Sequence, residues 1–242
     1  MELSKIISFL NRELQIDQFE DSAVNGLQVG SEKDILKIGF AVDATLQTFQ
    51  KAIESECDLI ITHHGISWGN DLKSIKGNNF KRVEFLIKKN LALAAYHLPL
   101  DAHSLYGNNA QIAAKLMLKR VEPFDVGVKG MLRDEIDIQE LAANINSSLK
   151  TASKVYNYGS NNIKTVAVIS GSASRMIESA SKVADVLITG DLSYGSQHIA
   201  RELQTNLIIA GHYETETCGV QALQAILEKK FGVKTIFIEG DN

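Results

Sequence analysis

Two adjacent histidines, His63 and His64, directly follow a short apolar run that begins at Leu59. A run of this length, rich in β-branched residues and bounded by Asp58, predicts a buried parallel strand. Ligands in open α/β sheets bind beyond the carboxyl ends of such strands, so both imidazoles stand where a ligand site is expected. Neighbouring side chains of an extended segment point in opposite directions, which suits two metal ions that take one histidine each. A bare histidine pair also fits one packed and one solvated side chain.

Further histidines and carboxylates occur in two matching patterns. His97 follows an apolar run and is followed four residues later by Asp101, and His212 and Glu216 repeat this spacing. Imidazole and carboxylate donors without thiolates suit zinc, iron, manganese or cobalt, and a carboxylate can bridge two ions. If two similar domains face each other, the strand ends of both converge on one cleft that holds His63, His64, His97, Asp101, Asp191, His212 and Glu216.

Other polar residues near these motifs have simpler explanations. We expect Asp191 to cap a helix. His103 fits a solvated loop, and His198 lies inside a predicted helix, where a surface position is expected. Cys57 and Cys218 show no pair spacing, so neither a disulfide nor a zinc knuckle is predicted.

The composition is that of a globular chain long enough for two modest domains, with 242 residues, 45% hydrophobic and 22% charged. No uncharged apolar run approaches the roughly twenty residues that span a bilayer. The first residues lack the basic and then apolar layout of a signal peptide, so we expect a cytoplasmic protein with no membrane partner. The formal net charge of −4 argues against non-specific binding to nucleic acid.

From residue 37 onward, apolar runs alternate with amphipathic helical runs, which is the βαβ pattern. Residues 1–14 predict an amphipathic helix, and the glycine-containing segment 24–30 is assigned to a turn or a close backbone approach. The stretch 121–137 predicts a connection between two halves. The predicted strands are 38–42, 59–62, 91–96, one near 155, 165–169, 186–189, 207–210 and 235–238, and the predicted helices are 46–56, 80–89, 109–118, 138–149, 176–183, 197–203 and 220–229.

The two halves resemble an internal repeat. Residues 58–62 (DLIIT) are mirrored by residues 185–189 (DVLIT), and each half sets a histidine at a strand end with a carboxylate four residues later. The fold class expected is therefore α/β, with two similar α/β domains over residues 1–125 and 126–242 and a metal site in the cleft between them.

Five motifs together carry a family resemblance. They are residues 25–30 (NGLQVG), 62–65 (THHG), 97–103 (HLPLDAH), 189–191 (TGD) and 211–216 (GHYETE). Their order and spacing over nearly the whole chain resemble the NIF-three-like family, whose bacterial and archaeal members are named GTP cyclohydrolase 1 type 2 homologues. The resemblance implies two similar α/β domains, a dinuclear metal centre between them and a ring-shaped homohexamer.

The resemblance also implies roles for individual residues. Two divalent metal ions per subunit would be held by His63, His64, Asp101, His212 and Glu216, with Glu216 reaching both ions. The catalytic role falls to His97, which would support the ligands or transfer a proton. Residues 65–68 (GISW) replace the proline and aromatic residues common in the family, and this segment borders the mouth of the cleft. The connection between the halves is too short for the inserted domain that some relatives carry.

Two functions of different classes follow. The first is a metal-dependent hydrolase for a small molecule, which opens the imidazole ring of GTP and gives formate and dihydroneopterin triphosphate. Lys73, Lys76, Lys81 and Arg82 are candidate cations for the triphosphate, although a solvated helix face explains them equally. The second is a ring-forming protein that stores, delivers or senses metal without turnover. The ligands of these two functions would be identical, so the motifs alone do not separate them. Hydrolysis of phosphate esters, which two-metal sites also support, is a third and weaker option.

Overall fold

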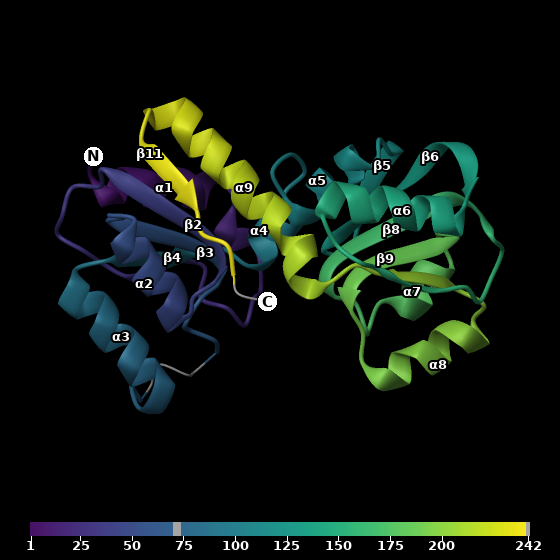
Figure 1. Cartoon of the computed structure of the whole chain (residues 1–242), viewed down its shortest axis with the longest axis horizontal. Helices are drawn as coiled ribbons and strands as arrows, with labels where there is room; N and C mark the ends of the chain where they lie inside the picture. Colours follow the sequence, from purple (N-terminus) through teal and green to yellow (C-terminus); the bar gives the residue numbers. More distant parts are fainter. Residues whose placement is uncertain (70–73, 241–242) are drawn as a thin grey trace. The chain divides into compact units, whose positions relative to one another are not determined.

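The computed structural model describes residues 1–69 and 74–240 (Figure 1). The chain divides into unit 1, made of Met1–Leu100 and Val220–Asn242, and unit 2, made of Asp101–Gly219. This division differs from the expected domains 1–125 and 126–242. The reason is that the chain returns to unit 1 through helix α9 (His212–Phe231) and strand β11 (Lys234–Phe237), which pairs with β2 (Lys37–Asp43).

Unit 1 contains a five-stranded sheet in the order β1-β4-β3-β2-β11. Strand β1 is antiparallel to β4, and the other pairs are parallel. The remaining elements are β1 (Gly26–Val29), β3 (Leu59–His64), β4 (Ala92–Ala95), α1 (Leu3–Glu13), the 3-10 helix η1 (Ile16–Gln18), α2 (Leu46–Glu54), α3 (Gly77–Lys89) and α4 (Leu98–Ala102), which ends in unit 2.

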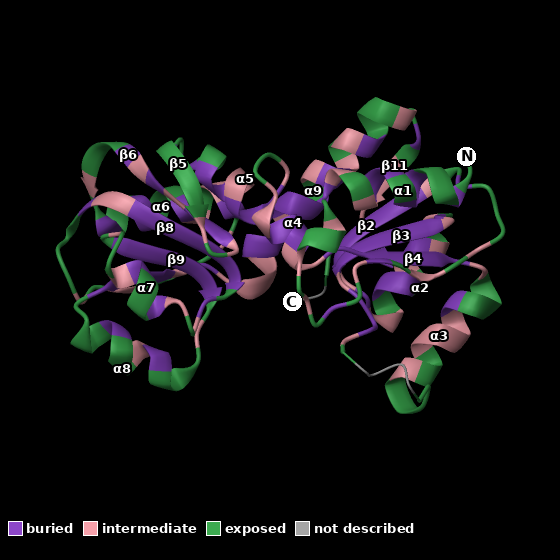
Figure 2. Ribbon diagram, turned by 180° about the vertical axis from the view of Figure 1, so that it is seen from behind, coloured by how far each residue is buried: buried purple, intermediate pink, exposed green. Residues whose placement is uncertain are grey.

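Helices cover the sheet of unit 1, so its central strands are buried on both faces. Ile60 of β3 and Leu93 of β4 belong to one apolar cluster with Phe49 of α2 and Leu86 of α3. Figure 2 shows β2, β3 and β4 as buried ribbons. Such burial explains why the run that ends in His63 is continuously apolar rather than alternating.

Unit 2 contains a six-stranded sheet in the order β5-β6-β8-β9-β10-β7. Strands β8, β9 and β10 are parallel, and β7 and β6 flank them in antiparallel pairs. Its elements are β5 (Lys119–Phe124), β6 (Gly127–Asp137), β7 (Lys154–Tyr156), β8 (Asn162–Ser172), β9 (Val186–Asp191), β10 (Asn206–Ile209), α5 (Asn108–Lys115), α6 (Ile138–Leu149), α7 (Ile177–Ser181) and α8 (Tyr194–Glu202).

The stretch 121–137, predicted as a connection, is instead the hairpin β5-β6, paired antiparallel from Lys119 with Met131 to Phe124 with Gly127. The strands lack a continuous apolar run because β5 is an exposed edge strand. In β6, Val128, Gly130 and Leu132 are buried at alternate positions, which is the period of a half-buried strand. Two glycines and a lysine within this segment hid that alternation.

The two sheets share one topology, as the internal repeat predicted. In each unit an antiparallel edge strand is followed by three parallel strands, in the order β1-β4-β3-β2 and β7-β10-β9-β8. The aspartates before the matching strands β3 and β9 also act alike. Asp58 Oδ2 accepts from the Leu36 amide at 2.9 Å, and Asp185 Oδ2 accepts from the Lys164 amide at 2.9 Å. The expectation of two similar α/β units is therefore confirmed.

None of the helices within the described residues is both long enough and apolar enough to cross a bilayer.

Candidate metal centre

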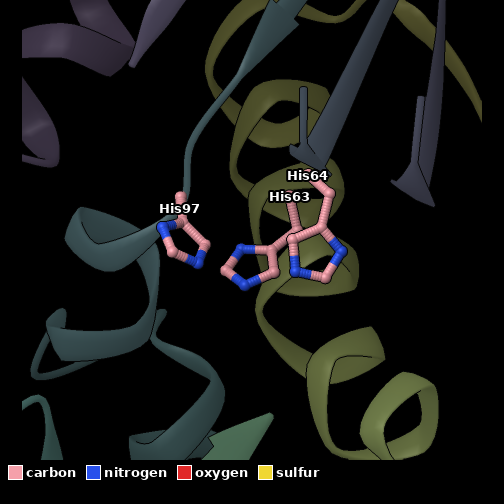
Figure 3. Close-up of side chains that lie close together, drawn as sticks. All are labelled: His63, His64 and His97. Atoms are coloured by element: carbon pink, nitrogen blue, oxygen red, sulfur yellow. The ribbon is translucent and has the colours of Figure 1, made fainter. Parts of the chain in front are cut away.

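Three histidines converge at the carboxyl ends of neighbouring strands in unit 1 (Figure 3). His63 and His64 end β3, and His97 follows β4. Each offers a ring nitrogen, and these three atoms lie within 4.8 Å of one another. The rings of His63 and His64 have centroids 4.7 Å apart, so they lie side by side and not on opposite sides of the strand. Both rings extend past the strand end, where alternation no longer separates them. These residues could hold a metal ion.

Hydrogen bonds fix which nitrogen each ring of β3 presents. His63 Nδ1 lies 2.9 Å from the Tyr96 carbonyl oxygen, which can only accept, so this nitrogen donates its proton. His64 Nδ1 lies 2.8 Å from Asp43 Oδ1 and donates to the carboxylate in the same way. Nε2 is therefore the nitrogen through which each ring can bind a metal ion. Metal-binding histidines are held in this manner by carbonyl or carboxylate oxygens.

His97 is held by Asp21, a residue that the sequence did not single out. Its Nδ1 lies 3.0 Å from Asp21 Oδ1, and its backbone amide donates to Asn25 Oδ1 at 2.7 Å. Asp21 also accepts from the Asn25 amide group and the Leu98 backbone, both at 3.0 Å. Burial alone would raise the pKa of Asp21. The hydrogen bonds from His97 and Asn25 nevertheless hold this pKa well below its usual range. An ionised carboxylate therefore orients the ring of His97.

The loop after His64 is anchored by the segment that the sequence assigned to a turn. Gln28, in strand β1, accepts from the Ile66 amide through Oε1 at 2.8 Å. A Cβ on Gly65 would collide with the amide group of Gln28, so a larger residue here would have to displace the side chain that holds Ile66. Trp68 forms a β-bridge with Ala23 and donates from Nε1 to the Gly65 carbonyl at 3.1 Å. The segment therefore supports the histidine cluster.

In unit 2, His212 and Glu216 lie in the first two turns of α9, whereas the sequence placed the helix start at residue 220. Their spacing of four residues puts both side chains on one helix face. His212 Nε2 lies 3.1 Å from Glu216 Oε1, and Nδ1 lies 2.6 Å from Asp191 Oδ2. The hydrogen bond to Glu216 contributes most to raising the pKa of His212 to about 9, and Asp191 adds to it. Negative surroundings that favour a protonated ring also favour a divalent cation.

The expectation that Asp191 caps a helix is wrong. Asp191 is the last residue of β9, and the residue before α8 is Ser193, whose hydroxyl lies 2.7 Å from that of Ser196. The carboxylate of Asp191 instead orients His212, as Asp43 orients His64 in unit 1.

Backbone geometry in unit 2 leaves room for Glu216. Gly171, near the end of β8, has a φ of +62°, a conformation that residues with a Cβ rarely adopt. A Cβ there would also meet Glu216 Oε1 closely and lie 3.3 Å from His212 Nε2. Glycine at this position therefore avoids both the strain of the positive φ and a clash with the carboxylate of Glu216.

Asp101 is a buried carboxylate of unit 2. Its Oδ1 accepts from Asn108 Nδ2 at 2.8 Å and from Ser170 Oγ at 2.9 Å. Asn108 is itself held, because its Oδ1 accepts from the Gly219 amide at 2.7 Å. The sequence predicted Asp101 as a ligand but did not identify the two residues that fix its orientation.

The remaining candidates lie as follows. His198 is exposed on α8, as expected, whereas His103 is half-buried and its Nδ1 accepts from the Tyr106 amide at 3.0 Å. Cys57 and Cys218 are both free and buried.

The candidate phosphate-binding cations lie mainly at the start of α3. Lys76 and Lys81 are exposed there, and Arg82 is half-buried. Lys73 lies outside the described residues.

The donor set fits a divalent transition metal. Imidazole nitrogens suit zinc, iron, manganese and cobalt, and carboxylates add negative charge to offset that of a cation. Every candidate histidine ligand also has an oxygen partner on Nδ1, namely Tyr96 for His63, Asp43 for His64, Asp21 for His97 and Asp191 for His212. Such partners determine ring orientation and increase ligand basicity.

Comparison with known proteins identifies a family. The family model of Duf34/NIF3 (NGG1p interacting factor 3) matches residues 1–242. A protein of Pyrococcus horikoshii named GTP cyclohydrolase 1 type 2 homolog is 42% identical and covers 99% of this chain and 98% of its own length. A protein of the same name from Deinococcus radiodurans is 40% identical, over 97% of this chain and 91% of its own.

Solved structures agree with these relatives. The crystal structure of a Thermus thermophilus protein matches with a TM-score of 0.94 and 38% identity, and covers 100% of this chain and 99% of its own. The expected family resemblance is confirmed, and the chain belongs to the Duf34/NIF3 family.

Proposed function

We propose that this protein is a metal-dependent hydrolase with a dinuclear centre that acts on a small molecule, and that GTP is its substrate. The metal-binding part rests on His63 and His64, whose rings converge beside that of His97, each ring being held through Nδ1. The names of the Pyrococcus and Deinococcus relatives support the choice of GTP, which a GTP cyclohydrolase would convert to formate and dihydroneopterin triphosphate.

Two divalent ions would be held by His63, His64, Asp101, His212 and Glu216. Glu216 is the proposed bridge, because a carboxylate presents one anionic oxygen to each ion. Asp43 and Asp191 would keep the rings of His64 and His212 oriented. Zinc, iron, manganese and cobalt all suit this set of donors.

Bound ions would lower the pKa of water towards neutrality and polarise the bond under attack. The chain itself supplies the proton transfer. His97 presents Nε2 to the cluster while Nδ1–H donates a hydrogen bond to Asp21, so the ring is held in one orientation and one tautomer. We assign His97 to moving a proton between water and the leaving nitrogen of the substrate.

Elemental analysis of metal-replete protein, combined with a formate-release assay on GTP, tests this function. Metal together with formate release supports the hydrolase. Tightly bound metal without formate would contradict it and favour the protein that stores, delivers or senses metal. Release of p-nitrophenol from bis(p-nitrophenyl) phosphate, without formate, would favour a phosphate esterase.

The family resemblance also supports a homohexamer, which we propose as the assembly. Light scattering at micromolar concentration and neutral pH should then give six times the chain mass of 26.6 kDa. A stable monomer under these conditions would exclude it.

A further inference from the structure

Trp68 is the only tryptophan in the chain, and it lies against the histidine cluster. Its ring centroid is 5.0 Å from that of His97, in an edge-to-face arrangement, and 5.9 Å from that of His64. The indole therefore forms a wall beside two of the three imidazoles that Figure 3 shows.

The indole is held in place by its own loop. Its Nε1 donates to the Gly65 carbonyl at 3.1 Å, so its hydrogen-bond donor is already used. The backbone on either side is tied to one strand-like segment, because Val24 donates to the Ser67 carbonyl at 3.1 Å and Gly69 donates to the Ser22 carbonyl at 2.5 Å. A half-buried indole whose position is fixed and whose donor is satisfied offers a ligand only its π surface and edge.

We propose that Trp68 is a specificity-determining residue, against which a planar heteroaromatic ring of the substrate stacks when the substrate reaches the histidine cluster. The inference depends on the proposed function only in that the substrate binds at this cluster. A rigid aromatic surface costs little conformational entropy and attracts the π face of a base. The substrate class is a purine or a similar fused ring system.

Phosphate groups alone would gain little from this surface, since the indole carries no charge and its N–H is engaged. A ligand bound through its base should therefore contact Trp68, and a ligand bound through its phosphates alone should not. This difference can be measured, because all tryptophan fluorescence of the protein comes from Trp68.

The experiment titrates zinc-loaded full-length protein with GTP, ATP or inorganic triphosphate. Tryptophan fluorescence is excited at about 295 nm, and its emission intensity is recorded. Stacking places a base in contact with the indole, so we expect GTP or ATP to quench the emission and inorganic triphosphate to leave it unchanged. Equal quenching by triphosphate, or no quenching by either nucleotide at millimolar concentration, would overturn the proposal.

Variants separate stacking from a structural role. Trp68→Ala should raise the dissociation constant of the quenching nucleotide, measured by calorimetry, by about 5- to 100-fold, and Trp68→Phe should restore most of the loss. Metal content should stay unchanged in Trp68→Phe. Tyr156→Ala is the matched control, because Tyr156 is a half-buried aromatic residue of β7 that packs against Tyr158. Loss of binding in Trp68→Phe equal to that in Trp68→Ala would contradict stacking.

This result is independent of turnover. Quenching by a nucleotide without formate release supports the stacking role and argues against the hydrolase. Formate release from GTP with the same KM in Trp68→Ala supports the hydrolase and overturns the stacking role.

Discussion

Asp191 was expected to cap a helix, but its carboxylate instead orients the ring of His212. Its carboxylate lies 2.6 Å from His212 Nδ1, so Asp191→Asn should leave the ring of His212 less firmly oriented. We expect the affinity for zinc to fall by about 10- to 100-fold, as determined by competition with a chelator. Asp134→Asn is the control, because Asp134 is an exposed acid of β6. An unchanged zinc affinity in Asp191→Asn would mean that the contact is incidental.

His97 should transfer protons rather than retain the metal. If Asp21 orients His97 and His97 transfers the proton, the His97→Ala variant should keep most of the bound metal and lose formate release. Metal content and activity of the purified variant are to be measured in parallel. Loss of both ions would instead make His97 a ligand, a role that its position within 4.8 Å of the other ring nitrogens allows.

Gly171 should be far less tolerant of a side chain than Gly77, although both have positive φ angles of +62° and +57°. Among the described residues, no atom outside the adjoining backbone lies within 4 Å of a Cβ built on Gly77, so we expect Gly77→Ala to carry only backbone strain, about 1 kcal/mol. Gly171→Ala must also displace Glu216, and we expect it to destabilise the fold by about 2–4 kcal/mol. Urea unfolding of both variants is the measurement. Equal costs would contradict the packing of Gly171 against Glu216.

Some of these partners were within reach of the sequence and others were not. Asp43 follows the apolar run of β2 directly, in the same position that made His63 and His64 candidates after β3. Asp21 and His97 are 76 residues apart in the sequence, and Asp21 lies in a loop that shows no helix or strand periodicity. Only the folded chain brings such residues together, so local pattern carries no signal for them.

At the level of secondary-structure elements, the repeat makes two aspartates equivalent. Asp58 accepts from the Leu36 and Lys37 amides at the start of β2, and Asp185 accepts from the Lys164 and Thr165 amides of β8. In the sequence, these two aspartates are the first residues of the repeated motif. In the structure, both accept hydrogen bonds from backbone amides of the neighbouring strand.

Replacement of either aspartate by alanine should therefore destabilise the protein similarly, by about 1–2 kcal/mol, because two strand amides lose a charged acceptor. Since the two sites share no partners, the costs should add in the double variant to within about 0.5 kcal/mol. Urea midpoints of both single variants and the double variant provide the measurement. If only one of the two replacements lowers the free energy of unfolding, the two aspartates are not energetically equivalent.

The βαβ elements were predicted well because strand and helix periods differ clearly in long apolar segments. The hairpin β5-β6 was missed since its exposed strand carries no such period. The start of α9 was placed eight residues late, at Val220 instead of His212, because the polar residues 212–217 resemble a loop. The ligand candidates there thus belong to a helix, where a spacing of four residues aligns two side chains.

For the whole molecule, two similar units could be predicted from the repeat, but not how the chain is shared between them. Strand β11 pairs with β2 across almost the full chain length, from Lys234 with Lys37 to Phe237 with Phe40. A contact of that sequence separation leaves no local trace, so the last segment was assigned to the second half by position alone.

Metal binding by these donors is tested most directly by elemental analysis of the zinc-replete, desalted full-length protein. We expect about two zinc ions per chain in the wild type and about one in Glu216→Gln, because the amide keeps the shape of the side chain but removes the charge that offsets the repulsion between two dications. Asp134→Asn should retain both. A wild-type protein that keeps less than about a tenth of an ion per chain, or a Glu216→Gln variant that keeps both ions, would contradict the dinuclear centre.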